Sequence, residues 1–160
     1  TTSLGAVSGA IVAFVTAYFM FKSYDHSMLL NGILGGLVGI TAGADVITPM
    51  EAIIIGAVAG ALIPFAVVFF DKLKLDDPVG ATSVHLVCGI WGTLAVGIFG
   101  EGKDIVAQLT GIAAIGVFSF TFAFILFYIL KITVGIRVSE SEEERGLDIT
   151  EHEMEAYKMF

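Results

Sequence analysis

Five apolar segments constrain this chain most, because each is long enough to cross a membrane as a helix. They cover residues 3–21, 28–44, 50–70, 78–99 and 105–134. A helical crossing needs about 20 mainly apolar residues, and none of the segments alternates with the two-residue period of a transmembrane strand. Hydrophobic residues make up 56% of the chain and charged residues 15%, which is more apolar surface than one soluble core could bury. The sequence predicts an all-α, polytopic transmembrane bundle within residues 1–134.

Short polar connections separate these segments, so consecutive helices are expected to be antiparallel neighbours. Asp77 followed by Pro78 predicts the start of the fourth helix, because a carboxylate caps free amides and a proline at the first position sacrifices no hydrogen bond. Pro64, inside the third segment, predicts a kink or a freed carbonyl group. Many glycines in the second, third and fourth segments predict close approach between helices.

Basic residues give the expected orientation, because Lys and Arg are retained on the cytoplasmic side of a membrane. With five spans, seven of the eight basic residues fall on one side and Lys103 alone falls on the other. The N-terminus is therefore expected outside the cell, and residues 135–160 form a cytoplasmic tail. The chain opens with Thr1 and has no basic residue before its first apolar segment, so we expect a piece of a longer protein rather than a signal peptide.

The net charge of −8 belongs mainly to the tail, because eight of the sixteen acidic residues lie between Glu140 and Glu155. Composition alone is typical of a disordered acidic segment there. The chain lacks the basic cluster of a nucleic-acid-binding protein. Its single cysteine, Cys88, excludes an internal disulfide and a multi-cysteine metal site, and we expect it to be a small buried residue. No metal or cofactor site is predicted.

One ionisable side chain, His85, lies deep within a predicted span. Counted from Pro78, it would lie about 10 to 12 Å from the cytoplasmic end of its helix, close to the middle of the membrane. Small uncharged residues share its expected face, namely Ala81, Cys88, Gly89 and Gly92. Because ionisable groups are costly in a bilayer and usually mark an ion or proton path, we expect His85 and Ala81 to line a narrow conducting lumen. A histidine hydrogen-bonded within the core is the alternative.

Other reactive side chains fit surface or packing roles better. An intramembrane enzyme would need a second acid, base or nucleophile at membrane depth, and a haem or metal site would need further ligands. His26 is expected at the surface of a cytoplasmic loop, and Trp91 is expected to face lipid or to be packed. Asp45 and Glu51 are expected to solvate an outer turn, with weak attraction of cations as the alternative.

Four segments, in order, resemble ammonium transporters of the Amt/Mep/Rh family. The run LDDPVGATSVHLVCGIWGTLAVGIFG at residues 75–100 is similar to the tenth transmembrane helix of that family. The other three are NGILGGLVGITAGADVITPMEAIIIGAVAG at 31–60, FFDKLK at 69–74 and VGIRVSESEEERGLDITEHEMEAY at 134–157. The resemblance covers nearly the whole chain, as the last five of eleven family helices and the cytoplasmic C-terminus, and it agrees with the orientation expected from the basic residues.

This resemblance implies most of the second of two inverted repeats, plus a final long helix. It also implies a homotrimer for nitrogen uptake, with a hydrophobic pore in each subunit that passes ammonia, with or without a separate proton, along two hydrogen-bonded histidines. His85 matches the second histidine of that pair. The first histidine, the aromatic gate and the outer recruitment site belong to family helices that this sequence does not contain. Transport of ammonium or ammonia, and no enzyme activity, is therefore expected; a sensor with an occluded pore that signals through its tail is the alternative.

The tail resembles the family's regulatory segment, which touches the neighbouring subunit. In many prokaryotic members a PII-type signalling protein plugs the cytoplasmic mouth of the pore. The residues expected to form this regulatory tail are Gly146, Asp148, Thr150, His152 and Tyr157. Gly146 to Asp148 would form a turn that caps a helix running through Tyr157, and Thr150 matches a phosphorylated position in plant relatives.

Overall fold

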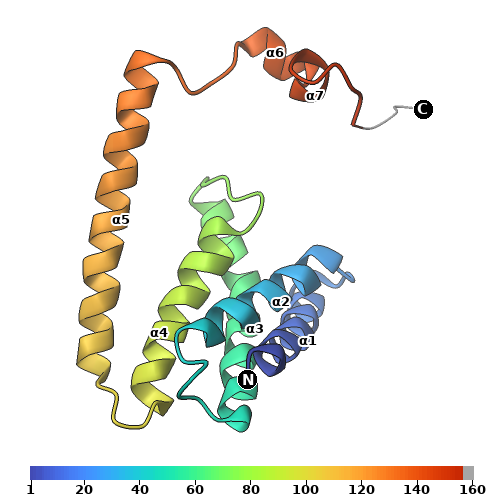
Figure 1. The fold of residues 1–160 in the computed structure, drawn as a ribbon. Coiled ribbons are helices and arrows are strands. Elements are labelled where there is room, and N and C mark those ends of the chain that lie inside the picture. The colour runs from blue at the N-terminus through green and yellow to red at the C-terminus, as the bar shows by residue number, and fades with distance from the viewer. Residues whose placement is uncertain (157–160) are drawn as a thin grey trace. The chain divides into compact units, whose positions relative to one another are not determined.

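Every regular element in the described part of the chain, residues 1–156 of a computed structural model, is helical (Figure 1). In order they are α1 (Thr2–Phe21), α2 (His26–Thr41), α3 (Pro49–Lys72), the π-helix η1 (Ala81–Leu86), α4 (Val87–Phe99), α5 (Ile105–Thr133), α6 (Glu140–Arg145) and α7 (Leu147–Thr150). The all-α prediction is confirmed.

Within residues 1–156, four helical stretches are long and apolar enough to cross a membrane. They are α1, α3, the continuous pair η1 and α4, and α5, whereas the apolar helix α2 has 16 residues. A straight crossing of the hydrocarbon core needs about 20 residues. With 16 residues, α2 could cross only where the hydrocarbon core beside the protein is locally thinner. The five-span arrangement of residues 1–134 stays a prediction that depends on α2.

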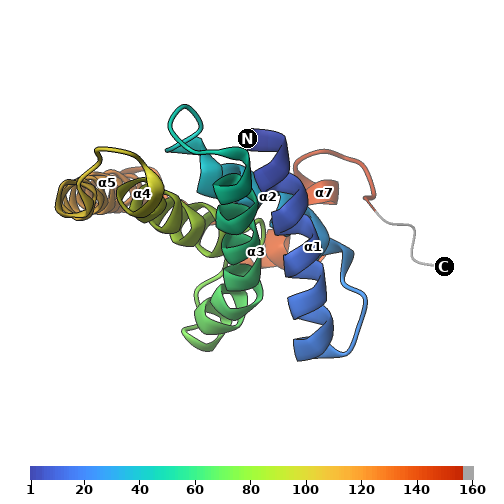
Figure 2. The same ribbon diagram turned by 90° about the horizontal axis from the view of Figure 1, so that it is seen from below.

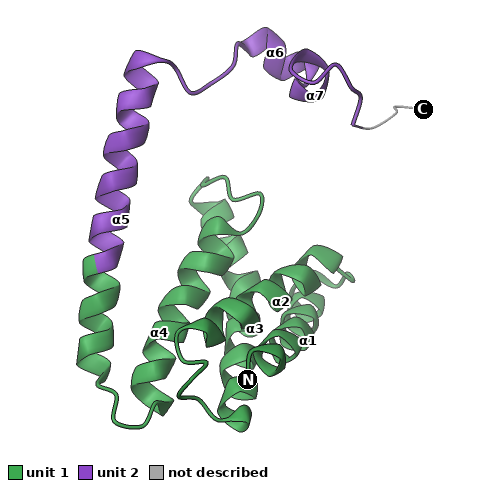
Figure 3. Ribbon diagram, viewed as in Figure 1, with its two compact units in different colours: residues 1–114 green, residues 115–160 purple. Residues whose placement is uncertain are grey.

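The chain forms two compact units, residues 1–114 and 115–160, and the boundary between them lies within α5 (Figure 3). This division reflects packing, whereas the predicted boundary at residue 134 separates the membrane part from the tail and stays a prediction. None of the 29 residues of α5 is buried by the described residues. Its aromatic side chains stack along the helix at four-residue spacing, as in Phe120, Phe124 and Tyr128.

Small residues set the packing of the first unit. α2 and α3 both contact α1 and the η1–α4 stretch, and Figure 2 shows α3 between α1 and α4. The carbonyl groups of Gly5 and Gly9 on α1 lie directly against glycines of its two neighbours, which are Gly32 and Gly36 on α2 and Gly56 and Gly60 on α3. Backbones can approach this closely only where no Cβ intervenes, as the glycine-rich segments predicted.

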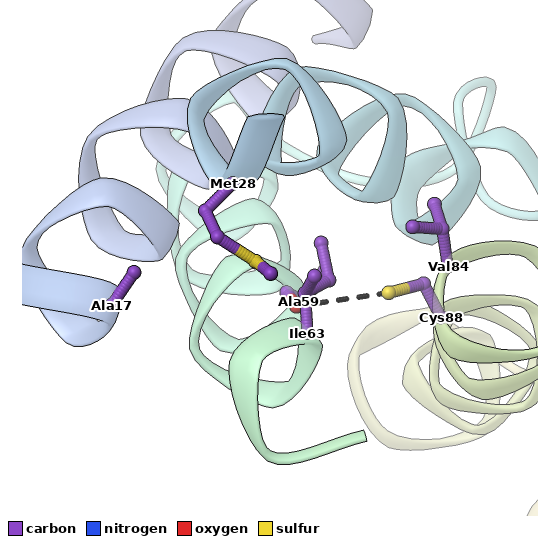
Figure 4. Packing of buried hydrophobic residues seen from close by; sticks show 6 residues of the cluster. All are labelled: Ala17, Met28, Ala59, Ile63, Val84 and Cys88. Atoms are coloured by element: carbon purple, nitrogen blue, oxygen red, sulfur yellow. Dashed lines mark hydrogen bonds between the residues drawn. The ribbon is translucent and has the colours of Figure 1, made fainter. Parts of the chain in front are cut away.

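Larger side chains fill two buried clusters on either side of Trp91. One cluster joins α1, α2, α3 and the η1–α4 stretch (Figure 4) and contains Ala17, Met28, Ala59, Ile63, Val84 and Cys88. The other contains Ile40, Ile47, Ala52, Ile55 and Ala95. The half-buried Trp91 packs against both clusters, and its Nε1 donates to the carbonyl oxygen of Ile55 at 3.0 Å. Of the two expectations for Trp91, the packed one describes this chain.

Replacing Trp91 by Phe tests this link between α4 and α3. The smaller ring keeps apolar contact but leaves the Ile55 carbonyl without the indole donor. We expect the free energy of unfolding to fall by about 1 to 2 kcal/mol, the usual cost of one lost hydrogen bond together with slightly poorer packing. Thermal unfolding of the purified membrane protein measures this change, and an unchanged midpoint would show that the bond contributes nothing.

Candidate functional site

His85 lies near the end of η1, a six-residue π-helix that leads directly into α4. Its backbone N–H donates to the carbonyl oxygen of Gly80 at 3.2 Å, and the N–H of Val84 donates to the same oxygen at 2.9 Å. A carbonyl shared between the fourth and fifth residues along the chain widens the helical turn. Segments of π-helix are rare and occur frequently at functional sites. The widened turn therefore marks residues 81–86, which include His85, on structural grounds.

The side chains of η1 divide between two directions. Ser83 and Val84 are 1% and 0% exposed, so they face the packed interior of the first unit. His85 and Ala81, four residues apart, are both exposed. The two residues expected to line a lumen thus lie on the open side of the first unit, and nothing within that unit covers them.

The expectation that Cys88 and Gly92 share the open face of His85 is wrong. Cys88 is fully buried, and its Sγ lies 3.6 Å from the carbonyl oxygen of Ala59, as the dashed line in Figure 4 shows. Gly92 is buried where a Cβ would overlap the carbonyl oxygen of Gly39 on α2. In one regular α-helix, residues 85, 88 and 92 would share a face, whereas the π-helical turn changes the angle between the residues before it and those after it. The expectation of a small, buried Cys88 is confirmed.

The helix that carries His85 starts later than predicted. Pro78 and Val79 form a turn, Gly80 adopts a left-handed backbone with φ of 79°, and helical structure begins at Ala81. A left-handed residue interrupts helical geometry, so Pro78 cannot be the first helical position. Gly80 rather than Asp77 is the N-cap, but the Asp77 carboxylate still accepts from the first free amides, across five and six residues rather than the usual two or three.

Asp77 is the most heavily hydrogen-bonded acid near the site. One carboxylate oxygen accepts from the backbone N–H and the hydroxyl of Ser83, both at 2.8 Å, and both oxygens lie 3.2 Å from the N–H of Thr82. Partial burial by itself would raise the pKa of Asp77, but the hydrogen bonds from Ser83 and Thr82 outweigh it and hold the pKa well below its ordinary value. The carboxylate is therefore ionised at neutral pH.

Sequence reasoning missed Ser83 and Gly80 as parts of this site. Ser83 is the one buried polar side chain among the core residues of the described chain, and Asp77 accepts its hydroxyl hydrogen. The signal was present as an acid followed by a glycine and then a serine, but six residues exceed the spacing of a capping box. Within residues 1–156 no group of three His, Cys, Asp or Glu side chains could hold a metal ion.

The predicted regulatory tail contains short ordered elements. In α6 a capping box links Ser139 to Glu142, and an exposed salt bridge joins Arg137 to Glu143 at 2.8 Å. A pair this exposed contributes about 1 kcal/mol or less. The Gly146 residue between α6 and α7 has φ of 90°, which favours glycine. A composition typical of disorder thus still encodes caps and a turn.

The predicted helix through Tyr157 is wrong over residues 151–156, because α7 ends at Thr150. The hydroxyl of Thr150 donates to the carbonyl oxygen of Gly146 at 3.0 Å, and the Asp148 carboxylate accepts from the N–H of Ala156 at 2.9 Å. That hydrogen bond is the main cause that lowers the pKa of Asp148, and the nearby charge of His152 lowers it further. His152 is exposed, and Tyr157 lies outside the described residues.

Comparisons with known proteins agree over nearly the full chain. The profile described as Ammonium Transporter Family matches residues 1–157. A Synechocystis protein with a provisional ammonium-transporter name is 43% identical over an alignment of 155 residues, which covers 94% of this chain and 35% of that protein. Ammonium transporter Amt2 of Archaeoglobus fulgidus is 37% identical over 179 residues, covering 99% of this chain and 38% of the relative. This chain therefore spans little more than a third of the length of these relatives.

Solved structures share the fold. A structure titled Sensor Amt Protein matches with a TM-score of 0.82 at 38% identity, over 94% of this chain and 40% of that one. The crystal structure of Saccharomyces cerevisiae Mep2 matches with a TM-score of 0.80 at 28% identity, over 88% of this chain and 36% of that one. These matches confirm both the predicted resemblance and the predicted class of membrane helical bundle.

Proposed function

This chain belongs to the Ammonium Transporter Family, and from that premise we propose that a full-length protein containing it carries ammonium or ammonia across a membrane. The family is one of transporters rather than enzymes, and the chain is a multi-pass membrane protein. The observation that carries the proposal is His85, an ionisable side chain on the open side of a membrane-spanning stretch. Such a group is costly against lipid and useful beside a conduction path.

His85 would act on the transported molecule through hydrogen bonds. A neutral imidazole has one donor and one acceptor nitrogen, so it can replace part of the water that ammonia loses on entering a narrow path. Its two ring nitrogens would also allow it to relay a proton. A second histidine, supplied by protein outside this chain, would complete the pair that the family resemblance implies. Ala81, one turn before His85, is also exposed, and its small side chain would leave room beside the imidazole ring.

The direct test is flux through the full-length protein in liposomes. An ammonium gradient is expected to change the internal pH of protein-containing vesicles about tenfold faster or more than that of empty vesicles, because a dry pore with a hydrogen-bonding wall lowers the barrier for a polar molecule. A stopped-flow pH-sensitive dye follows this rate. Equal rates in both vesicles would reject conduction.

A sensor that binds ammonium without conducting it is the second candidate, supported by the likeness to the structure titled Sensor Amt Protein. In that case the tail, residues 135–160, would pass the signal to a partner. The two candidates separate in the flux experiment combined with ammonium binding by calorimetry. Binding without flux would favour the sensor, whereas both together would favour transport.

We further propose a homotrimer with the N-terminus of this chain outside the cell and the tail in the cytoplasm, where a PII-type protein would find it. The uneven distribution of basic residues supports the orientation. Reporter enzymes fused after the tail, and mass measurement of the detergent-solubilised protein, test the two statements. Activity of a reporter that works only outside the cell would reverse the orientation.

A further inference from the structure

The residues just before His85 are held in place from two sides. The hydroxyl and the N–H of Ser83 both donate hydrogen bonds to the Asp77 carboxylate. Val84 packs in the buried cluster that also contains Ile63 and Cys88. A Cβ at Gly80 would meet the side chain of Val84 at 2.7 Å, so the left-handed turn and the buried valine also fit closely. With both preceding side chains fixed inward, the His85 side chain is left on the exposed side of η1.

The π-helical hydrogen bond at His85 depends on the same arrangement. In a regular α-helix the N–H of His85 would donate to the carbonyl of Ala81, whereas here it donates to Gly80. The N–H groups of Thr82 and Ser83 have no helical partner at this first turn, and the Asp77 carboxylate accepts both. An ionised acceptor forms stronger hydrogen bonds than a neutral one, and it is stabilised near the N-terminus of a helix.

We propose that Asp77 is a positioning residue, which directs His85 to the open side of the unit by holding Thr82 and Ser83 in the widened first turn of η1. Asp77 itself lies eight residues before His85 and acts through the backbone. The functional part of this inference rests on the proposed role of His85. The part that concerns the direction of residue 85 does not.

The test measures that direction without relying on transport. In the full-length protein, His85→Cys is combined with Cys88→Ala and with removal of any other cysteine, so that residue 85 carries the only thiol. The rate at which the small neutral reagent methyl methanethiosulfonate modifies this thiol is then compared with and without Asp77→Asn. Asn has nearly the same shape, but its amide N–H₂ would face the Ser83 donors. We expect the modification rate to fall about tenfold, because residue 85 would no longer be held on the open side once the charge-assisted hydrogen bonds are lost.

Asp76→Asn is the matched control, because Asp76 is an exposed acid next to Asp77 in the same connection. It is expected to leave the rate unchanged. If Asp77 serves only overall stability, Asp77→Asn will lower the thermal midpoint but leave the thiol of the folded protein equally reactive, and the proposal is overturned. Should Asp77→Asn fail to fold, Ser83→Ala removes only the hydroxyl bond and is expected to lower the rate about threefold. An unchanged rate for Ser83→Ala also overturns the proposal.

Uptake of methylammonium by the protein with His85 intact separates this inference from the proposed function. If Asp77→Asn changes both the thiol rate and uptake, both statements stand. If the thiol rate changes while uptake does not, Asp77 positions residue 85 but that residue does not line the path. If uptake falls with an unchanged thiol rate, the path can involve His85, and the positioning role of Asp77 is rejected.

Discussion

His85→Asp in the full-length protein is expected to lower methylammonium uptake about tenfold or more while the protein still assembles. The substitution exchanges an imidazole, which both donates and accepts, for a carboxylate that only accepts when ionised. A fixed negative charge in a narrow, poorly hydrated path would hold a cation rather than release it. A polar solute that passes there without a hydrogen-bond donor also loses about 1 to 3 kcal/mol of stabilising free energy. Because His85 is exposed in this unit, the change costs little packing within the chain.

His26→Asp is the matched control for that experiment. His26 is exposed at the first position of α2, where an acid is compatible with the helix dipole. Its substitution is expected to leave uptake within about twofold of the parent protein, since surface substitutions away from a site usually cost little. The uptake of radiolabelled methylammonium, normalised to the amount of assembled protein, is measured for both variants. Parental uptake by His85→Asp would refute the pore-lining role.

The helices were predictable because the signals that produce them are local. Apolar segments bounded by charged residues, prolines and glycines placed the long helices within a few residues of their observed ends, as for the segment 50–70 and α3 at Pro49–Lys72. Here Thr48 and Glu51 form a capping box around Pro49, which is a signal contained within four residues. Each such end can be recognised without knowledge of the rest of the fold.

The geometry around His85 was not predictable in the same way. Its position followed from the cost of an ionisable group in a membrane, but its surroundings were predicted from a regular 3.6-residue period. The carboxylate of Asp77 reaches Ser83 across a turn with a left-handed Gly80, and this arrangement shifts the start of the helix to Ala81. Whether Cys88 faces inward then depends on packing against Ala59, a contact 29 residues away in sequence.

The tail illustrates the opposite error. The turn at Gly146 to Asp148 was expected to cap a helix through Tyr157, but the Asp148 carboxylate accepts from the backbone of Ala156 and Glu153 has a left-handed φ of 53°. These features close a turn immediately after Thr150. Acidic residues with short side chains favour such local bonds over helix, so the same composition that suggested disorder encodes compact turns instead.

Gly60→Ala is expected to destabilise the protein through a clash with backbone atoms of α1. A Cβ at residue 60 would overlap the carbonyl oxygen of Gly9 and come within 2.9 Å of its Cα and carbonyl carbon, all of them backbone atoms. A flexible side chain could rotate away, but α1 as a whole would have to move, and α1 also packs on α2 through Gly5 and Gly36. Overpacking of this kind costs about 1 to 3 kcal/mol or more.

Gly89→Ala provides the matched comparison, because a Cβ there meets only the Val38 side chain at 3.9 Å, an ordinary contact. Both glycines are helical, so each alanine gains about 0.5 to 1 kcal/mol in helix propensity. Propensity should therefore leave Gly89→Ala as stable as the parent or slightly more so, while steric overlap dominates at residue 60. Thermal unfolding of the purified full-length variants in detergent measures the difference. Equal midpoints for the two variants would mean that α1 and α3 do not approach through Gly9 and Gly60.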